Sequence, residues 1–205
     1  MTPASSTAAG RTATIERRTG ETDVSLTLTL EGTGAGSRTT GVGFLDHMLD
    51  LLARHGRMDL EVKVSGDLQT GAHHTAEDTA IVLGQALDKA LGERAGIARY
   101  GAATVPMDEA RAACTIDVSG RPFTLFQADL PPGSTGGFEH ELTEEFFRAL
   151  ANAAKLTVHL EVQAGSNAHH MIEAAFKAFA RALREAVAMD PGETGVPSTK
   201  GTLTS

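Results

Sequence analysis

The pattern His-His-x-x-Glu occurs twice in this chain, once in each half. The first copy spans His73–Glu77 and the second spans His169–Glu173. Residues four apart lie on one face of a helix, so the first histidine and the glutamate of each copy can bind one ion together. The second histidine of each copy, His74 or His170, points roughly 100° away from the first around the helix. It is therefore free to reach a second ion.

The repetition extends beyond the histidines. A strand-like run precedes each copy, at 60–64 and at 156–162, and a helical run follows it. Farther upstream, each half has a helix start that contains one more histidine, His47 in the first half and His140 in the second. These parallels predict an α+β fold in which two tandem, pseudo-symmetric β-β-α-β-α halves pack together through the helix-covered faces of their sheets.

Glycine-rich and proline-rich stretches set the predicted boundaries. Gly92 and Gly96 separate the halves, and periodicity places the helices of the second half at 139–154 and 169–189. The predicted organisation is a flexible N-terminus at 1–10, a first repeat at 11–95, a second repeat at 96–190 and a C-terminal tail at 191–205.

The charge balance excludes one class of partner. Lys and Arg number 18 against 26 Asp and Glu, for a formal net charge of −8, and no basic run is present. Nucleic-acid binding is driven by clustered cations that neutralise phosphates, so we expect no nucleic-acid partner. No apolar run approaches the ~20 residues of a membrane helix, and the single Cys114 favours a reducing compartment. We therefore expect a cytoplasmic protein with no membrane partner.

Six of the eight histidines occupy the duplicated positions, which random placement would not produce. Imidazole and carboxylate donors without thiolate favour divalent Mn, Fe, Co, Ni or Zn. Such a set leaves coordination positions open for water or substrate. Symmetry allocates to one ion His73, Glu77, His140 and His170, and to the other His169, Glu173, His47 and His74.

Three residues outside the duplicated set have weaker signals. His159 alternates with apolar neighbours in a predicted strand and is expected to face solvent. His55, at the end of the first helix, is either a partner of the helix dipole or the wall of a pocket. Glu21 lies in the turn of the first predicted hairpin and is a candidate acid or base.

A further group of residues favours an anionic ligand. Ser198, Thr199 and Lys200 combine hydroxyls with a cation, and Arg99 and Arg121 each lie close to a predicted strand end. Each of these is, taken alone, more often a surface residue. Cations that converge on a metal site in an acidic protein would nevertheless suit an anionic substrate.

Several of these segments, in this order and spacing, resemble the imidazoleglycerol-phosphate dehydratase family of histidine biosynthesis. The resemblance covers the chain from about Thr12 to Leu203. Ala72 and Arg111 depart from the family's usual residues, and neither departure removes a ligand. The segments that carry the resemblance are Asp46-His47-Met48-Leu49, His73-His74-Thr75-Ala76-Glu77-Asp78, Met107-Asp108-Glu109, Ser119-Gly120-Arg121-Pro122, His169-His170-Met171-Ile172-Glu173-Ala174 with Phe176-Lys177, and Pro197-Ser198-Thr199-Lys200-Gly201.

The resemblance implies an enzyme, a carbon–oxygen lyase that dehydrates D-erythro-imidazole-glycerol phosphate to imidazole-acetol phosphate. It implies that this reaction depends on two Mn2+ ions per subunit. It also implies a fold like that of ribosomal protein S5 domain 2 and a homo-oligomer of 24 subunits, with active sites at the interfaces between subunits.

The resemblance and the motif together assign roles to individual residues. The expected catalytic residues are Glu21, His47, His74 and Glu173. The residues expected to bind the substrate or its phosphate are Arg99, Arg121, Ser198, Thr199, Lys200, Lys177 and His55. The expected metal ligands are His47, His73, His74, Glu77, His140, His169, His170 and Glu173.

Two other functions are compatible with the same residues. A dinuclear metallohydrolase acting on a small phosphorylated or amide substrate needs its ions close together and takes up water instead of releasing it. A metal-dependent assembly or storage protein loses its oligomeric state when metal is removed, and binds no small phosphate ester.

Overall fold

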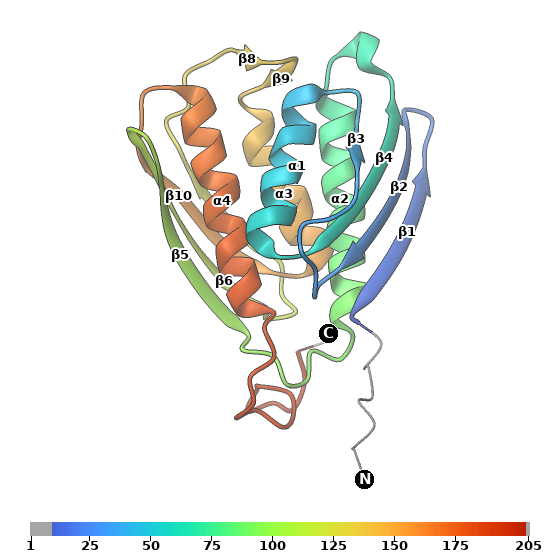
Figure 1. The fold of residues 1–205 in the computed structure, drawn as a ribbon, viewed down its shortest axis with the longest axis vertical. Coiled ribbons are helices and arrows are strands. Elements are labelled where there is room, and N and C mark those ends of the chain that lie inside the picture. The colour runs from blue at the N-terminus through green and yellow to red at the C-terminus, as the bar shows by residue number, and fades with distance from the viewer. Residues whose placement is uncertain (1–9, 204–205) are drawn as a thin grey trace.

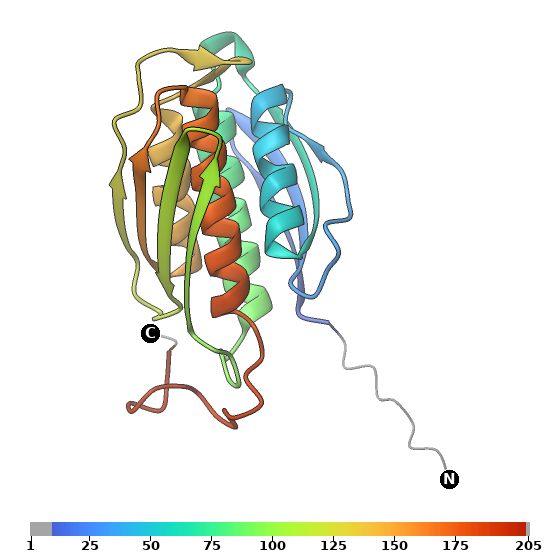
Figure 2. The same ribbon diagram turned by 60° about the vertical axis from the view of Figure 1, so that its left-hand side comes forward.

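The computed structural model describes residues 10–203. The predicted flexible N-terminus at 1–10 lies outside this range, apart from Gly10. Two four-stranded sheets flank a layer of four α-helices (Figure 1), and a view from another side shows the same layers (Figure 2). Each half of the chain contributes one sheet and two of these helices.

The elements follow the same order in both halves. The first half contains β1 (Thr12–Arg18), β2 (Thr22–Thr29), β3 (Arg38–Thr39), α1 (Gly43–Gly56), β4 (Asp59–Gly66), the 3-10 helix η1 (Leu68–Thr70) and α2 (His73–Leu91). The second half contains β5 (Tyr100–Met107), β6 (Ala110–Asp117), β7 (Phe123–Gln127), β8 (Ser134–Thr135), β9 (Phe138–Glu139), α3 (Leu142–Ala154), β10 (Thr157–Ala164) and α4 (Ala168–Ala186).

Strand order confirms the internal repeat. The first sheet runs β1-β2-β4-β3 and the second runs β5-β6-β10-β7. In both sheets the last pair is parallel, β3 with β4 and β7 with β10, and the other pairs are antiparallel. The prediction of two β-β-α-β-α halves in an α+β fold is therefore confirmed.

The helices bury the inner faces of both sheets. α2 packs on β1 and β2 and α4 packs on β5 and β6, while α1 meets α4 and α2 meets α3 across the boundary between the halves. The inner rings include Phe146, Phe147, Phe176 and Phe179, all fully buried. Burying one such side chain contributes roughly 1.5–3 kcal/mol. No helix within residues 10–203 combines the length and apolar character needed to cross a bilayer.

Gly84 explains how closely α2 and α3 pack. A Cβ atom at this position would lie 2.5 Å from the carbonyl oxygen of Leu150 and 2.7 Å from the Cβ of Ala153. Glycine in a helix interior is unfavourable by roughly 1 kcal/mol relative to alanine. The close approach of the two halves requires this glycine and offsets that loss.

Two predicted helix ends are wrong. The helix expected from 139 begins at Leu142, because Phe138 and Glu139 pair with β8 and leave His140 outside the helix. The helix expected to reach Met189 ends at Ala186, because the following residues turn back to pair with the linker between the halves, through a bridge of Met189 to Ile97.

Candidate metal centre

Three predicted ligands come together where α1 meets α4. One ligand atom each from His47, His169 and Glu173 lies within 4.8 Å of the others, and residues 10–203 contain no second group of three that satisfies this criterion. His47 lies in the first turns of α1, and the other two lie in the first turns of α4. Nε2 of His47 is 2.8 Å from Oε1 of Glu173. Two nitrogens and one oxygen form the donor set.

The carboxylate of Glu173 remains charged although the residue is only 5% exposed. Burial alone would raise its pKa, but hydrogen bonds from His47 and Lys177 outweigh burial, so the pKa lies below its ordinary value. Nζ of Lys177 is 3.1 Å from Oε2 of Glu173 and 3.2 Å from Sδ of Met107. A metal ligand must be deprotonated, and this environment keeps the carboxylate in that form.

The start of α4 is fixed by its own cap and by two ring contacts with α1. Oδ1 of Asn167 accepts a hydrogen bond from the backbone N–H of His169 at 2.9 Å, which satisfies one of the free donors at the helix start. The ring centroids of His169 and Phe44 are 5.0 Å apart, and those of His169 and His47 are 6.2 Å apart. The histidine ring is therefore held against α1.

The second histidines of the two motifs have matching environments. Nδ1 of His74 lies 3.0 and 3.1 Å from the carboxylate oxygens of Asp67, and Nδ1 of His170 lies 2.7 Å from Oε2 of Glu109. Their Nε2 atoms each have a second carboxylate at 3.7 Å, Glu21 in the first case and Asp108 in the second. A carboxylate acts only as an acceptor, so Nδ1 carries the proton and Nε2 is left as the metal-binding atom.

The contacts of His74 with Asp67 and of His170 with Glu109 shift the pKa values of these groups. The hydrogen bond that His74 donates to Asp67 raises the pKa of His74, and the one that His170 donates to Glu109 raises the pKa of His170. The pKa of Glu109 falls to about 2, first because of His170 and then because backbone N–H groups donate to it. Sequence reasoning assigned no role to Asp67, Asp108 or Glu109. The last two lie in the hairpin turn that corresponds to the turn of Glu21, which is a signal that could have found them.

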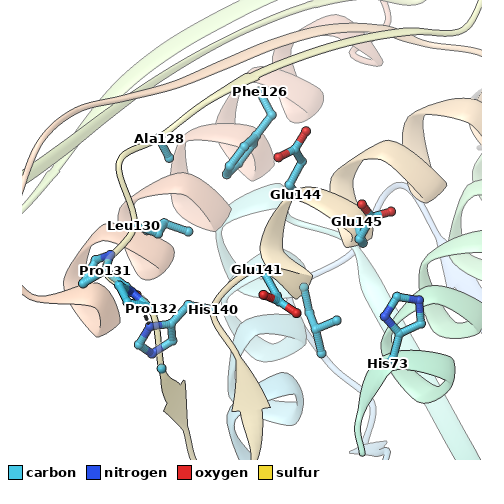
Figure 3. A pocket seen from close by; sticks show the side chains of 12 residues that line it. His73, Phe126, Ala128, Leu130, Pro131, Pro132, His140, Glu141, Glu144 and Glu145 are labelled. Carbon is cyan, nitrogen blue, oxygen red and sulfur yellow. Dashed lines mark hydrogen bonds between the residues drawn. The ribbon is translucent and has the colours of Figure 1, made fainter.

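The other predicted ligand set does not come together within one protomer. Nε2 of His73 is 3.9 Å from Oε2 of Glu77, as the motif predicts. Both ring nitrogens of His140 are engaged locally, Nδ1 with the carbonyl oxygen of Pro131 at 2.7 Å and Nε2 with Oγ1 of Thr135 at 3.0 Å. A cavity of about 450 Å³ separates the His140 and His73 rings, which enter it from different elements (Figure 3).

Three of the predicted phosphate-binding residues line one hollow beside the tail. The Arg99 guanidinium holds Asp117 through Nε and Nη2 at 2.8 and 3.2 Å, and its Nη1 donates to the carbonyl oxygen of Pro197 at 2.8 Å. Arg99, Ser198 and Thr199 line an open hollow of about 580 Å³. These three bonds leave some of the five guanidinium N–H donors free for an anion.

The remaining candidates are more scattered. Lys200 and Arg121 are exposed, and neither lines the hollow beside Arg99. His55 is partly buried, and burial together with the nearby charge of Lys177 lowers its pKa. His159 is exposed on β10, as predicted.

The candidate residues divide between the two ends of the molecule. The first turns of α1, α2 and α4, the β8–β9 hairpin and the β5–β6 turn lie at one end, and the tail after α4 lies at the opposite end (Figure 1). The metal-ligand candidates belong to the first end, whereas Ser198, Thr199 and Lys200 belong to the second. A single protomer therefore cannot present its own tail to its own histidine cluster.

A family model and several relatives match most of the chain. The family model described as imidazoleglycerol-phosphate dehydratase matches residues 40–183. The chain is 55% identical over 194 residues to the imidazoleglycerol-phosphate dehydratase of Rhodopseudomonas palustris (strain TIE-1), covering 94% of this chain and 98% of that protein. It is 56% identical over 194 residues to the protein of that name in Methylorubrum populi, covering 94% of this chain and 100% of that one.

Two solved structures share the fold. The crystal structure of imidazoleglycerol-phosphate dehydratase from Staphylococcus aureus subsp. aureus N315 matches with a TM-score of 0.80 and 38% identity, over 87% of this chain and 99% of that one. The structure of IGPD from Pyrococcus furiosus in complex with (S)-C348 matches with a TM-score of 0.79 and 35% identity, over 92% of this chain and 99% of that one. By sequence and by fold, this chain belongs to the imidazoleglycerol-phosphate dehydratase family, a family of hydro-lyases in histidine biosynthesis.

Proposed function

We propose that this protein catalyses the manganese-dependent dehydration of D-erythro-imidazole-glycerol phosphate to imidazole-acetol phosphate, with two Mn2+ ions per subunit. The observation that carries this proposal is the convergence of His47, His169 and Glu173 within 4.8 Å. Relatives of the same name, 55–56% identical, support the choice of substrate.

The residues present fit a divalent cation. Two imidazoles and one buried, ionised carboxylate are donors that suit Mn2+ among other divalent ions. His74 and His170 each have Nδ1 held by a carboxylate, which leaves Nε2 for a metal. A bound cation would act as a Lewis acid on a substrate nitrogen or oxygen and as a template for the substrate.

Dehydration removes the hydroxyl from the carbon beside the imidazole ring and a proton from the next carbon. The enol that results becomes the ketone of imidazole-acetol phosphate, and one water leaves. We assign the proton removal to Glu21, whose exposed carboxylate lies 3.7 Å from Nε2 of His74. This short separation supports the assignment, because a base at Glu21 would act beside a ligand that orients the substrate.

The substrate phosphate would bind to Arg99, Arg121, Ser198, Thr199 and Lys200. Arg99 and the two tail hydroxyls already share one hollow, and a planar guanidinium suits a phosphate group. The chain has a net charge of −8, so a local group of cations would attract an anion to that place. Lys177 and His55, which lie near Glu173, would contact the rest of the substrate.

The active site would form between subunits of a homo-oligomer, for which we propose 24 copies. The helix starts that carry the metal-ligand candidates and the tail lie at opposite ends of one protomer (Figure 1). The set of His73, Glu77, His140 and His170 forms no convergent group of three among residues 10–203. Neighbouring subunits would complete both arrangements. We also propose a cytoplasmic location, supported by the single free thiol of Cys114, which is buried and whose pKa is raised by burial.

The test is a turnover assay on chelator-treated protein supplied with imidazoleglycerol phosphate and Mn2+. The ketone product is measured by the absorbance of its enol in alkali, and we expect it only when both metal and substrate are present. His159→Ala serves as a control that should behave like the wild type. A fully metallated oligomer that forms no ketone would contradict the proposal, and release of inorganic phosphate instead would identify a hydrolase.

A further inference from the structure

Arg94 is buried in the segment that joins the two halves. Its side chain is 0% exposed, and its backbone has a left-handed φ of 58°. Nη1 donates to the carbonyl oxygen of Leu203 at 2.5 Å, and Nη2 donates to Oδ1 of Asp88 at 2.5 Å and to the carbonyl oxygen of Ala154 at 3.1 Å. A buried charge is tolerated only when it is paired and hydrogen-bonded, so these partners have to remain in place.

The three partners of Arg94 belong to three different parts of the fold. Asp88 lies near the end of α2 in the first half, Ala154 ends α3 in the second half, and Leu203 lies in the C-terminal tail. The side chain of Leu203 is also buried, with the residue 4% exposed. Its carbonyl oxygen packs so closely on Gly120 that a Cβ there would approach it to 1.9 Å. The tail is therefore anchored on the turn that precedes Arg121.

The same linker anchors the tail a second time. Nη1 of Arg99 donates to the carbonyl oxygen of Pro197 at 2.8 Å. Between the two anchors the chain makes a turn around Ser198. The N–H of Gly201 donates to the carbonyl oxygen of Ser198 at 2.9 Å, and the N–H of Lys200 donates to the Oγ of Ser198 at 3.2 Å. The segment 198–200 is thus held at both ends by arginines of one linker.

We propose that Arg94 is a positioning residue that presents Ser198, Thr199 and Lys200 in a preformed turn to the substrate phosphate. This inference rests on the proposed function, because that function makes the tail a phosphate-binding segment. A turn that is already ordered loses less conformational freedom when the phosphate binds, so binding is tighter. Arg94 does not itself touch the substrate and acts only through the carbonyl oxygen of Leu203.

The test compares Arg94→Lys with Leu203→Ala in the assembled, manganese-loaded protein. A lysine ammonium cannot reach three acceptors at once, and the alanine removes the buried anchor while leaving Arg94 intact. For both variants we expect KM and the inhibition constant of inorganic phosphate to rise about tenfold, with kcat changed less than about threefold, because the lost interaction is made equally in ground and transition states. Hydrogen exchange at the amides of 198–203 should accelerate.

Lys155→Gln is the matched control. Its ammonium binds the other oxygen of Asp88 at 3.0 Å, so the variant loosens the same carboxylate without touching the tail. We expect wild-type KM and wild-type exchange of the tail. A similar rise of KM in this control would overturn the proposal, since loosening of Asp88 alone would then explain the effect.

Two further outcomes overturn the role of Arg94. One is a fall of kcat and melting temperature with KM and tail exchange unchanged, which indicates a purely structural arginine. The other is unchanged KM and tail exchange in Arg94→Lys, or in Arg94→Gln if the lysine variant does not fold. A wild-type protein without dehydratase activity would refute the proposed function instead, and tail exchange and phosphate binding would still decide the role of Arg94.

Discussion

The two copies of the His-His-x-x-Glu motif share one sequence pattern but have different structural surroundings. At α4, His169 and Glu173 meet His47 of α1 in one compact cluster. At α2, His73 and Glu77 have no third ligand within the same distance among the residues that the structure describes, although His140 lines the same cavity as His73. Within residues 10–203, one ligand set brings three of its members together in a single protomer, and the other does not.

The difference arises from where each upstream histidine lies relative to its helix. His47 lies inside α1, which packs against α4, so its ring reaches Glu173 at the start of α4. His140 precedes α3, and its ring is held by the Pro131 carbonyl and the Thr135 hydroxyl. The rings of Phe44 and Phe138, which precede these histidines, still pack together with centroids 5.8 Å apart. The two phenylalanines therefore pack on each other, whereas the two histidines differ in position, one inside its helix and the other before it.

The largest expected effect distinguishes the two glutamates. Glu173→Gln keeps the shape of the side chain but removes the charge that a buried cation needs. We expect kcat to fall by at least about 10²-fold, with loss of one of the two Mn2+ ions per subunit and an intact oligomer. Glu77→Gln should lose the other ion and also loosen the oligomer, because in the proposed assembly its co-ligands come from other subunits. Metal analysis, kinetics and native mass measure these outcomes.

The contrast would be refuted by identical behaviour of the two variants. If Glu173→Gln dissociates the oligomer as readily as Glu77→Gln does, the α1–α4 cluster is not complete within a protomer. If both leave the manganese content unchanged, neither glutamate is a ligand. His159→Ala, with its exposed ring on β10, should match the wild type in every measurement.

A smaller effect is expected at the carboxylates that orient the second histidines, where the two halves are alike. Asp67→Asn and Glu109→Gln weaken the carboxylate that orients His74 or His170, so each should reduce the affinity for Mn2+ by about 10- to 100-fold while the protein remains folded. Equal losses would show that the orienting carboxylates are functional duplicates. A loss in only one variant would show that the halves differ here as well. Competition titration with a chelator measures the affinity.

A control for these substitutions is Glu31→Gln. Its exposed carboxylate pairs with Arg11, so it changes an acidic side chain at the surface without a histidine partner. Such exposed pairs contribute little to stability. Its manganese affinity should equal that of the wild type.

Most of the fold could be predicted from local sequence patterns, because the folded protein keeps the strands and helices that these patterns predict. Strand alternation, helical periodicity and the duplicated order predicted both sheets and their helices, and the spacing of four residues placed Glu173 beside His169. The same logic is wrong at His140, because two-residue strands form a hairpin where helical periodicity predicts the start of a helix. Pairing between short strands depends on the surrounding packing, which local periodicity does not record.

The partners of the second histidines and the anchor of the tail could not be predicted for another reason. Asp67 reaches His74 through the turn of η1, and Glu109 reaches His170 from a hairpin in another part of the chain. Arg94 binds three segments that are distant in sequence. None of these contacts has a fixed spacing, so only the assembled fold brings the groups together.

The smallest expected effect concerns the pH dependence of stability in metal-free protein. Glu109 has a folded pKa of about 2, below the ordinary 4.5, so its contribution is present above pH 4.5 and is lost as pH falls toward 2. His170 has a folded pKa raised above 6.5 by Glu109, so its contribution is full below pH 6.5 and is lost as pH rises through the folded pKa. The pair therefore stabilises most between pH 4.5 and 6.5.

Thermal melts of the wild type and Glu109→Gln, both treated with chelator, measure this window. Glutamine can still accept from the backbone N–H groups of Ser166 and Asn167, so the variant mainly removes the charge. We expect the wild type to have the higher melting temperature, by the largest margin near about pH 5.5 and by smaller margins near about pH 3 and pH 8.5. Asp67→Asn should show the same profile through His74, because the two histidines have the same kind of partner. A margin that does not vary with pH would show that the pair is not ionised in the folded protein, and a profile in only one half would extend the asymmetry of the ligand clusters to the carboxylates behind them.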